Sequence, residues 1–148
     1  MERKIIEDLI KKRNLRTKEI DKEKVISLLN AIEKNISAVK KINLNEENST
    51  IIFKEVYDAI RQIADAFWWL EGYEVLRDHD ASFTVLKDIE VSQKFKINYI
   101  ERFKKIRNDA NYRGFLVSIK QAQEILDFWN SYGLEIMAFL KKKIDKIK

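Results

Sequence analysis

The residues whose types and spacing suit chemistry lie together near position 107. An arginine guanidinium offers paired N–H donors that match two phosphate oxygens, while asparagine and tyrosine side chains add neutral donors. Here such residues stand at the end of an amphipathic helix pattern that Gly114 terminates. The pattern predicts phosphate recognition by Arg107, Asn111, Arg113 and Lys104, with Asn108 and Tyr112 beside them. The competing interpretation is a structural cluster in which Arg107 pairs with an acid.

Other chemistries have few residues to build on. The chain has one histidine, His79, and no cysteine, which leaves little for nucleophilic triads or thiolate chemistry. Asp78 and Asp80 flank His79, but adjacent side chains point in different directions, so a helix-capping loop is favoured over a metal site. A glycine-rich phosphate loop is also missing. We therefore expect neither a metal nor a cofactor.

Charge is distributed unevenly along the chain. Residues 44–90 contain eleven acids and four bases, whereas residues 94–113 contain seven bases and two acids, and the net charge is +5. This pattern indicates one acidic and one basic face, although solvated helix faces are the simpler interpretation for the C-terminal lysines. The basic stretch coincides with the residues around Arg107. That coincidence makes these bases more suggestive of a binding site than the C-terminal lysines are.

The chain shows no signal of export or membrane insertion. Acidic residues interrupt the N-terminal segment where a signal peptide would have its apolar core. The longest apolar run, residues 66–70, is far too short to span a bilayer. The lack of cysteine fits a reducing compartment. We expect a cytoplasmic protein without membrane contact.

The spacing of apolar residues predicts about five helices. Apolar residues recur three and four positions apart, which is the period of a helix with one buried face. Ser49 or Thr50 can cap the second helix, Gly114 stops the fourth, and Ser118 with Gln121 forms a capping box for the last. The expected helices cover residues 18–42, 50–73, a short segment around 83–89, 92–112, and 118 nearly to the C-terminus.

These helices predict an all-α fold. Short connections between long helices favour antiparallel neighbours, hence an up-and-down bundle formed by residues 18–148 as one domain. Residues 1–17 are a basic amphipathic segment, either a small extra helix or an arm that docks on a partner. Trp68 and Trp69 are adjacent, so a helix directs them about 100° apart. One is expected in the core and the other at a neighbouring helix or dimer interface, with stacking on a nucleobase as the alternative.

Residues from about 25 to 145 resemble the HEPN family, small helical proteins of prokaryotic toxin–antitoxin and defence systems. The resemblance rests on residues 59–73, 107–112 and 118–139. The family motif is an arginine, usually followed by a polar residue, and then a histidine after four to six intervening positions. Arg107 and Asn108 match that motif. Tyrosine, arginine and glycine occupy positions 112–114, so the histidine has no counterpart.

The resemblance implies a homodimer whose arginine and histidine cleave RNA without a metal in active relatives. A tyrosine has a reference pKa of about 10, against about 6.5 for histidine, so Tyr112 is a poor general base. Losing proton transfer costs roughly 10²–10⁴-fold in rate. The leading hypothesis is therefore RNA or nucleotide binding around Arg107 with weak or lost ribonuclease activity, with Arg107, Asn108 and Tyr112 at the former catalytic positions.

Two alternatives remain open from the sequence. In the first, the protein is an active, metal-independent ribonuclease toxin in which Tyr112 or a repositioned His79 replaces the missing base. In the second, it is a non-enzymatic interaction module whose acidic half docks a basic partner. The resemblance suggests a nucleotidyltransferase as that partner, because one is often encoded beside this family.

Overall fold

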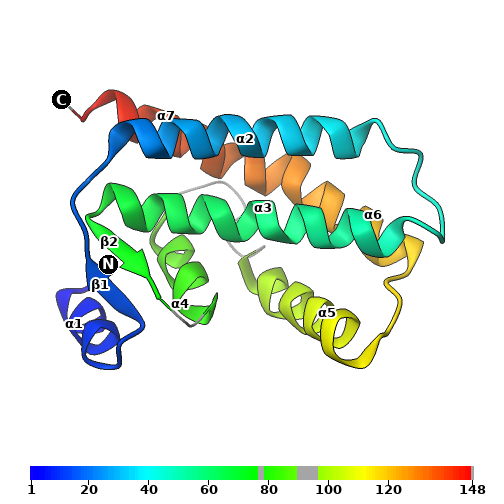
Figure 1. Cartoon of the computed structure of the whole chain (residues 1–148), viewed down its shortest axis with the longest axis horizontal. Coiled ribbons are helices and arrows are strands. Elements are labelled where there is room, and N and C mark those ends of the chain that lie inside the picture. The colour runs from blue at the N-terminus through cyan, green and yellow to red at the C-terminus, as the bar shows by residue number, and fades with distance from the viewer. Residues whose placement is uncertain (77–78, 90–96, 148) are drawn as a thin grey trace.

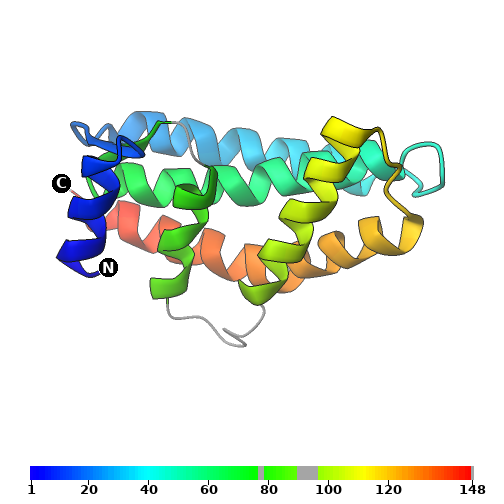
Figure 2. The ribbon, with the colours of Figure 1, turned by 90° about the horizontal axis from the view of Figure 1, so that it is seen from below.

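Three long helical rods lie side by side and form the body of the protein (Figures 1 and 2). The computed structural model describes residues 1–76, 79–89 and 97–147. The first rod is α2 (Lys22–Lys40) and the second is α3 (Ser49–Leu70). The third runs from α6 (Ile119–Phe128) through a π-helical segment (Trp129–Gly133) into α7 (Leu134–Asp145). The protein is mostly helical, as predicted.

The rods do not all alternate in direction. Helix α2 runs antiparallel to α3, as a short connection requires. The third rod runs parallel to α3: Val117 before its start bonds Thr50 at the start of α3, and Lys143 near its end pairs with Glu71 just past α3. The strictly antiparallel arrangement that we predicted is therefore wrong for this pair. The chain between the two rods crosses the bundle and returns to the end where α3 begins.

That crossing segment contains the shorter helices on one side of α3 (Figure 2). It comprises α4 (His79–Thr84), a 3₁₀ turn (Val85–Asp88) and α5 (Tyr99–Arg113). Gly114 ends α5 in the left-handed conformation, with φ of 69°, as predicted. Asp78 and part of the predicted 92–112 helix lie outside the described residues, as do the side chains of His79 and Asp80.

The N-terminal segment packs on the body and adds a small sheet. Helix α1 (Arg3–Lys11) leads into β1 (Leu15–Thr17), which pairs antiparallel with β2 (Tyr73–Val75). Leu15 is buried in the common core. The prediction of a purely α fold is wrong to this extent. The predicted helices 18–42 and 50–73 also extended too far towards these strands. Residues 18–21 lead from β1 into α2, and residues 71–72 lead from α3 into β2.

Helix α3 lies at the centre, so its side chains are buried around most of its circumference. Ile52, Val56, Ile60 and Ile63, which recur three or four positions apart, are at most 1% exposed. Burial of such a side chain contributes roughly 1.5–3 kcal/mol, so the apolar side chains of α3 contribute substantially to stability. The predicted pair of tryptophans also divides: Trp68 is buried and donates its indole N–H to the Ala81 carbonyl at 2.9 Å, while Trp69 is half-buried.

The connection between α5 and α6 is fixed against the start of α3. Ser49 and Thr50 were predicted to cap α3, but their hydroxyls bond Val117 instead. The Ser49 hydroxyl donates to the Val117 carbonyl at 2.5 Å, and the Val117 N–H donates to Thr50 Oγ1 at 2.9 Å. The predicted capping box of Ser118 and Gln121 is present and opens α6. Both ends of this connection are thus held, and α5 is anchored beside α3.

Candidate phosphate-binding site

Arg107 lies where α5 meets the central helix. Phe103 and Ala110, on the buried face of α5, hold the helix against the core, and Arg107 is half-buried at the edge of that face. Its guanidinium carbon lies over the ring of Tyr57, 5.5 Å from the ring centroid. A cation above an aromatic face is attracted by the ring quadrupole, by about 0.5–2 kcal/mol according to its exposure. The contact holds the Arg107 side chain in a defined place.

Tyr57 is a rigid platform for this arginine. It projects from α3, is 1% exposed, and packs edge-on against Phe83 of α4 at a centroid distance of 5.7 Å. Burial raises the pKa of Tyr57 to about 12, although the positive charge of Arg107 opposes the shift. The phenol therefore stays neutral at physiological pH. It does not neutralise the guanidinium above it.

Arg107 makes no ion pair with a carboxylate in the parts of the chain that the structure describes. Arg61 of α3 is a second arginine whose positive charge opposes the rise in the pKa of Tyr57. Unlike Arg107, it is paired with Asp65 one turn later at 3.1 Å. The interpretation in which Arg107 pairs with an acid thus finds no acid partner there. Among the described residues, the charge of Arg107 is therefore not neutralised by a carboxylate.

Only part of the predicted cluster shares the face of Arg107. Successive residues on a helix are about 100° apart, so Lys104 and Asn111 fall within about 60° of Arg107. Lys104 is half-buried and Asn111 is exposed. Asn108 lies about 100° around the helix and is half-buried. Lys104, Arg107 and Asn111 can therefore meet one extended anion.

The other two predicted residues point elsewhere. Tyr112 lies about 140° from Arg107 around α5 and is 79% exposed. Arg113 lies about 120° away in the opposite sense, with its Nε 4.0 Å from Asp109. Within one chain, Tyr112 and Arg113 do not reach an anion held by Arg107.

The sequence interpretation missed Tyr57 and Arg61. With Asp65 they recur every four residues along α3, a row of polar side chains on a helix that is otherwise apolar. That spacing was the available signal. It could not show which distant helix would cover the row.

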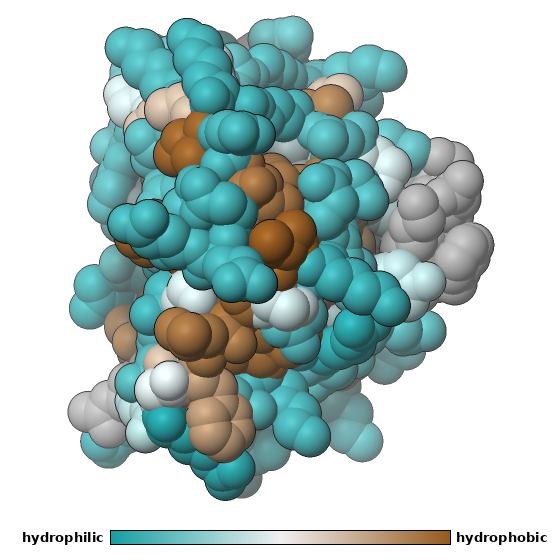
Figure 3. Space-filling model, turned by 90° about the vertical axis from the view of Figure 1, so that its right-hand side faces the viewer, coloured by the Kyte–Doolittle hydropathy of each residue, from teal (hydrophilic) through white to brown (hydrophobic). Residues whose placement is uncertain are grey.

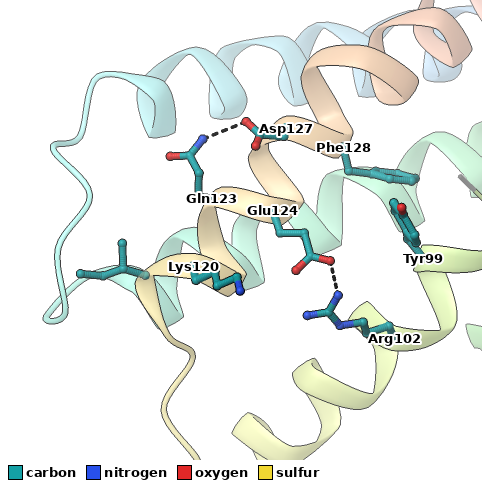
Figure 4. Close-up of a pocket in the computed structure, with 8 residues that line it drawn as sticks. Tyr99, Arg102, Lys120, Gln123, Glu124, Asp127 and Phe128 are labelled. Atoms are coloured by element: carbon teal, nitrogen blue, oxygen red, sulfur yellow. Dashed lines mark hydrogen bonds and ion pairs between the residues drawn. The ribbon is translucent and has the colours of Figure 1, made fainter.

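A groove beside α5 is lined by none of the residues of this cluster (Figure 4). It has a volume of about 910 Å³ and lies between α5 and α6. Its arginine, Arg102, is ion-paired with Glu124 across the groove, and Gln123 bonds Asp127 at 2.9 Å. Because the guanidinium of Arg102 is already paired, and two carboxylates, Glu124 and Asp127, line the groove beside Lys120, the groove offers less to a phosphate than Arg107 does.

Exposed apolar side chains gather at the end of the molecule that carries the α5–α6 connection (Figure 3). Leu116 is 83% exposed and Phe115 is 56% exposed, and Ile51 lies nearby at the start of α3. Large exposed apolar patches mark interaction surfaces in soluble proteins. This apolar patch comprises Ile51, Tyr112, Phe115, Leu116 and Ile119.

No protein-family model matches the chain significantly, and neither does any curated protein or solved structure. Among the described residues, no group of three or more histidine, cysteine or acidic side chains is placed to hold a metal ion. Nor does any helix in the described parts of the chain have the length and apolar character needed to cross a bilayer.

Proposed function

We propose that the protein binds RNA or a nucleotide through a phosphate at Arg107, in a HEPN-like helical bundle whose ribonuclease activity is weak or lost. The observation that supports it most is the Arg107 guanidinium, held over Tyr57 and without a carboxylate partner in the described chain. An arginine that is already positioned loses little conformational freedom when it binds phosphate, which favours binding. The resemblance to HEPN proteins suggests a role in a toxin–antitoxin or defence system.

The placement of Tyr112 favours binding over cleavage. A general base must lie within hydrogen-bond reach of the proton that it removes. Tyr112 projects into solvent on a different side of α5 from Arg107, so one chain does not place the two around one phosphate. A ribonuclease of the HEPN type would need the second protomer of a dimer to complete the site. The active ribonuclease toxin is therefore the less favoured alternative.

The binding proposal is tested with a fluorescent single-stranded RNA oligonucleotide. We expect Arg107→Ala to weaken binding about 10–100-fold, the range for a lost charge-assisted hydrogen bond, and to lower the salt dependence by about one phosphate contact. Arg3→Ala is the matched control, because Arg3 is 93% exposed on α1. Equal affinity of Arg107→Ala and wild type would refute the proposal.

The same RNA, analysed for strand cleavage, separates binding from catalysis. We expect wild type, Arg107→Ala and Tyr112→Phe to leave the strand intact over the time of the binding measurement. Cleavage by wild type that Arg107→Ala abolishes would establish the ribonuclease alternative. Tyr112→His would then show whether the missing base alone limits the rate.

The apolar patch favours a second candidate function, that of an interaction module. Its exposed side chains, Leu116 above all, suit a protein surface better than a nucleic acid. The occupant would be a second copy of the chain or a nucleotidyltransferase partner. Absence of RNA binding, together with self-association through this patch, would favour this function over the first.

A further inference from the structure

Two lysine ammonium groups lie over the ring of Trp69. This tryptophan stands at the end of α3 that is remote from the connection between α5 and α6. Lys18 Nζ lies 5.1 Å from the Trp69 ring centroid and Lys24 Nζ lies 4.6 Å from it. Lys18 follows β1, Lys24 stands in the first turns of α2, and Trp69 is in the last turn of α3. Three separate elements thus converge on one half-buried indole ring, which fixes where both cations lie.

Positive charge exceeds negative charge in this cluster. The cluster also includes Arg16 of β1 and the carboxylate of Glu74 in β2. The Glu74 oxygens lie 2.6 Å from Arg16 and 3.8 Å from Lys18. Lys24 pairs with no carboxylate in the described parts of the chain. The cluster therefore holds three cations and one anion.

The two ammonium groups also lie close to each other. Side-chain contact with Lys24 lowers the pKa of Lys18, as does partial burial, while Glu74 opposes the shift. Like charges at this separation repel, and the two lysines gain from any group that places negative charge between them. A phosphate has the charge and the acceptor oxygens to bond both ammonium groups at once.

We propose that Lys18 and Lys24 bind a phosphate group beside Trp69, with Arg16 adding its charge. The phosphate would stand between the two ammonium groups, against the indole that positions them. Twelve residues of α3 separate Trp69 from Tyr57, which corresponds to about 18 Å along the helix axis. This site is thus distinct from the one at Arg107. It stands whether or not Arg107 binds RNA.

The test follows the indole N–H signal of Trp69 by two-dimensional NMR, with pyrophosphate as the probe and Trp69→Phe to assign the signal. Trp68 and Trp129 are buried and serve as internal references. We expect a saturable shift of the Trp69 signal that Lys18→Gln or Lys24→Gln weakens about tenfold, as for a lost charged hydrogen bond. Lys34→Gln, an exposed lysine farther along α2, should leave the affinity unchanged.

No saturable shift at Trp69, or equal weakening by Lys34→Gln, would overturn the proposal. A second arm uses a ten-nucleotide oligouridylate in place of pyrophosphate, on wild type and on Arg107→Ala. A Trp69 shift that persists in Arg107→Ala identifies the RNA backbone as a source of the phosphate and shows that the two sites are independent. A shift with pyrophosphate alone identifies a free phosphate or nucleotide as the source.

Discussion

The Arg107 guanidinium rests on the Tyr57 ring, which joins the edge of α5 to the central helix. Tyr57 is in turn fixed by Phe83, so three helices determine where this one charge lies. A surface arginine ordinarily samples many rotamers, and ordering it costs up to about 2 kcal/mol. Here the protein's own packing orders it. That contact gives Tyr57 the role of positioning Arg107 in the candidate site.

Replacing Tyr57 separates the role of its ring from that of its hydroxyl. Tyr57→Phe keeps the aromatic face under Arg107, so we expect RNA affinity close to that of wild type. Tyr57→Leu removes the face and the edge-on contact with Phe83, so Arg107 loses its support. We expect weaker RNA binding, by about threefold to tenfold, together with a loss of stability of about 1–3 kcal/mol.

Urea unfolding of Tyr57→Leu distinguishes the two effects. Binding is measured at a temperature where unfolding data show the variant to be folded. Equal RNA affinity of the folded Leu variant and wild type would mean that the ring does not position Arg107. A comparable loss in Tyr57→Phe would instead point to the hydroxyl.

Local patterns in the sequence predicted those features of the fold that depend on neighbours along the chain. Gly114 ends α5 and Ser118 with Gln121 opens α6, because each signal acts within one turn of helix. The strands were missed because three residues are too few for an alternating pattern to be recognised. Their pairing is between segments far apart in the sequence. The parallel course of α3 and the last rod likewise depends on how the whole chain crosses the bundle.

The candidate site shows the same limit. Arg107 was found from sequence because basic residues cluster around it, whereas Tyr57 becomes its partner only when α5 crosses α3. The π-helical segment also could not be recognised from the sequence. Trp129, Tyr132 and Ile136 are spaced as an uninterrupted α-helix would space them, and all three are buried in the structure.

The apolar patch makes a prediction about self-association. Leu116 is 83% exposed, so Leu116→Glu removes little packing and should change stability by less than about 0.5 kcal/mol. If two copies meet through this patch, the buried glutamate would destabilise the dimer. We expect wild type to sediment as a dimer and Leu116→Glu as a monomer.

Ile20→Glu serves as the control, since Ile20 is a 44% exposed apolar residue before α2 and outside the patch. Dimers that persist in Leu116→Glu would place the interface elsewhere. A wild type that is monomeric at all concentrations would leave a different protein as the partner of the patch.

Gly133 is required by the ring of Trp129. A Cβ atom at position 133 would lie 2.6 Å and 2.7 Å from two ring carbons of Trp129, and that ring is 1% exposed in the core. The ring cannot withdraw without displacing other core residues, so we expect Gly133→Ala to lower stability by about 1–3 kcal/mol. Gly114→Ala meets no atom within 4 Å and has only the strain of its φ of 69°. Thermal unfolding should therefore give a lower melting temperature for Gly133→Ala than for wild type. The fluorescence of Trp129 should change as well, and an unchanged signal would contradict the predicted clash with its ring.

Two buried phenols predict a loss of stability at alkaline pH. Burial raises the pKa of both Tyr57 and Tyr132 from 10 to about 12, and Tyr132 is also raised by the nearby charge of Glu135. Between pH 10 and 12 the unfolded chain ionises these phenols while the native protein keeps them protonated. The stabilising contribution is complete below pH 10 and is lost as the pH rises toward 12, with a slope of at most about 1.4 kcal/mol per pH unit for each phenol.

The comparison that isolates this effect is urea unfolding of wild type and Tyr57→Phe across the same pH range. Lysines also titrate there, but they do so in both proteins and cancel in the difference. The free energy of unfolding of Tyr57→Phe should fall less steeply above pH 10 than that of wild type, and the two should run parallel below it. Parallel curves throughout would mean that Tyr57 ionises as readily in the native protein as in the unfolded chain. Its ring would then be open to water, which is incompatible with the closed contact beneath Arg107.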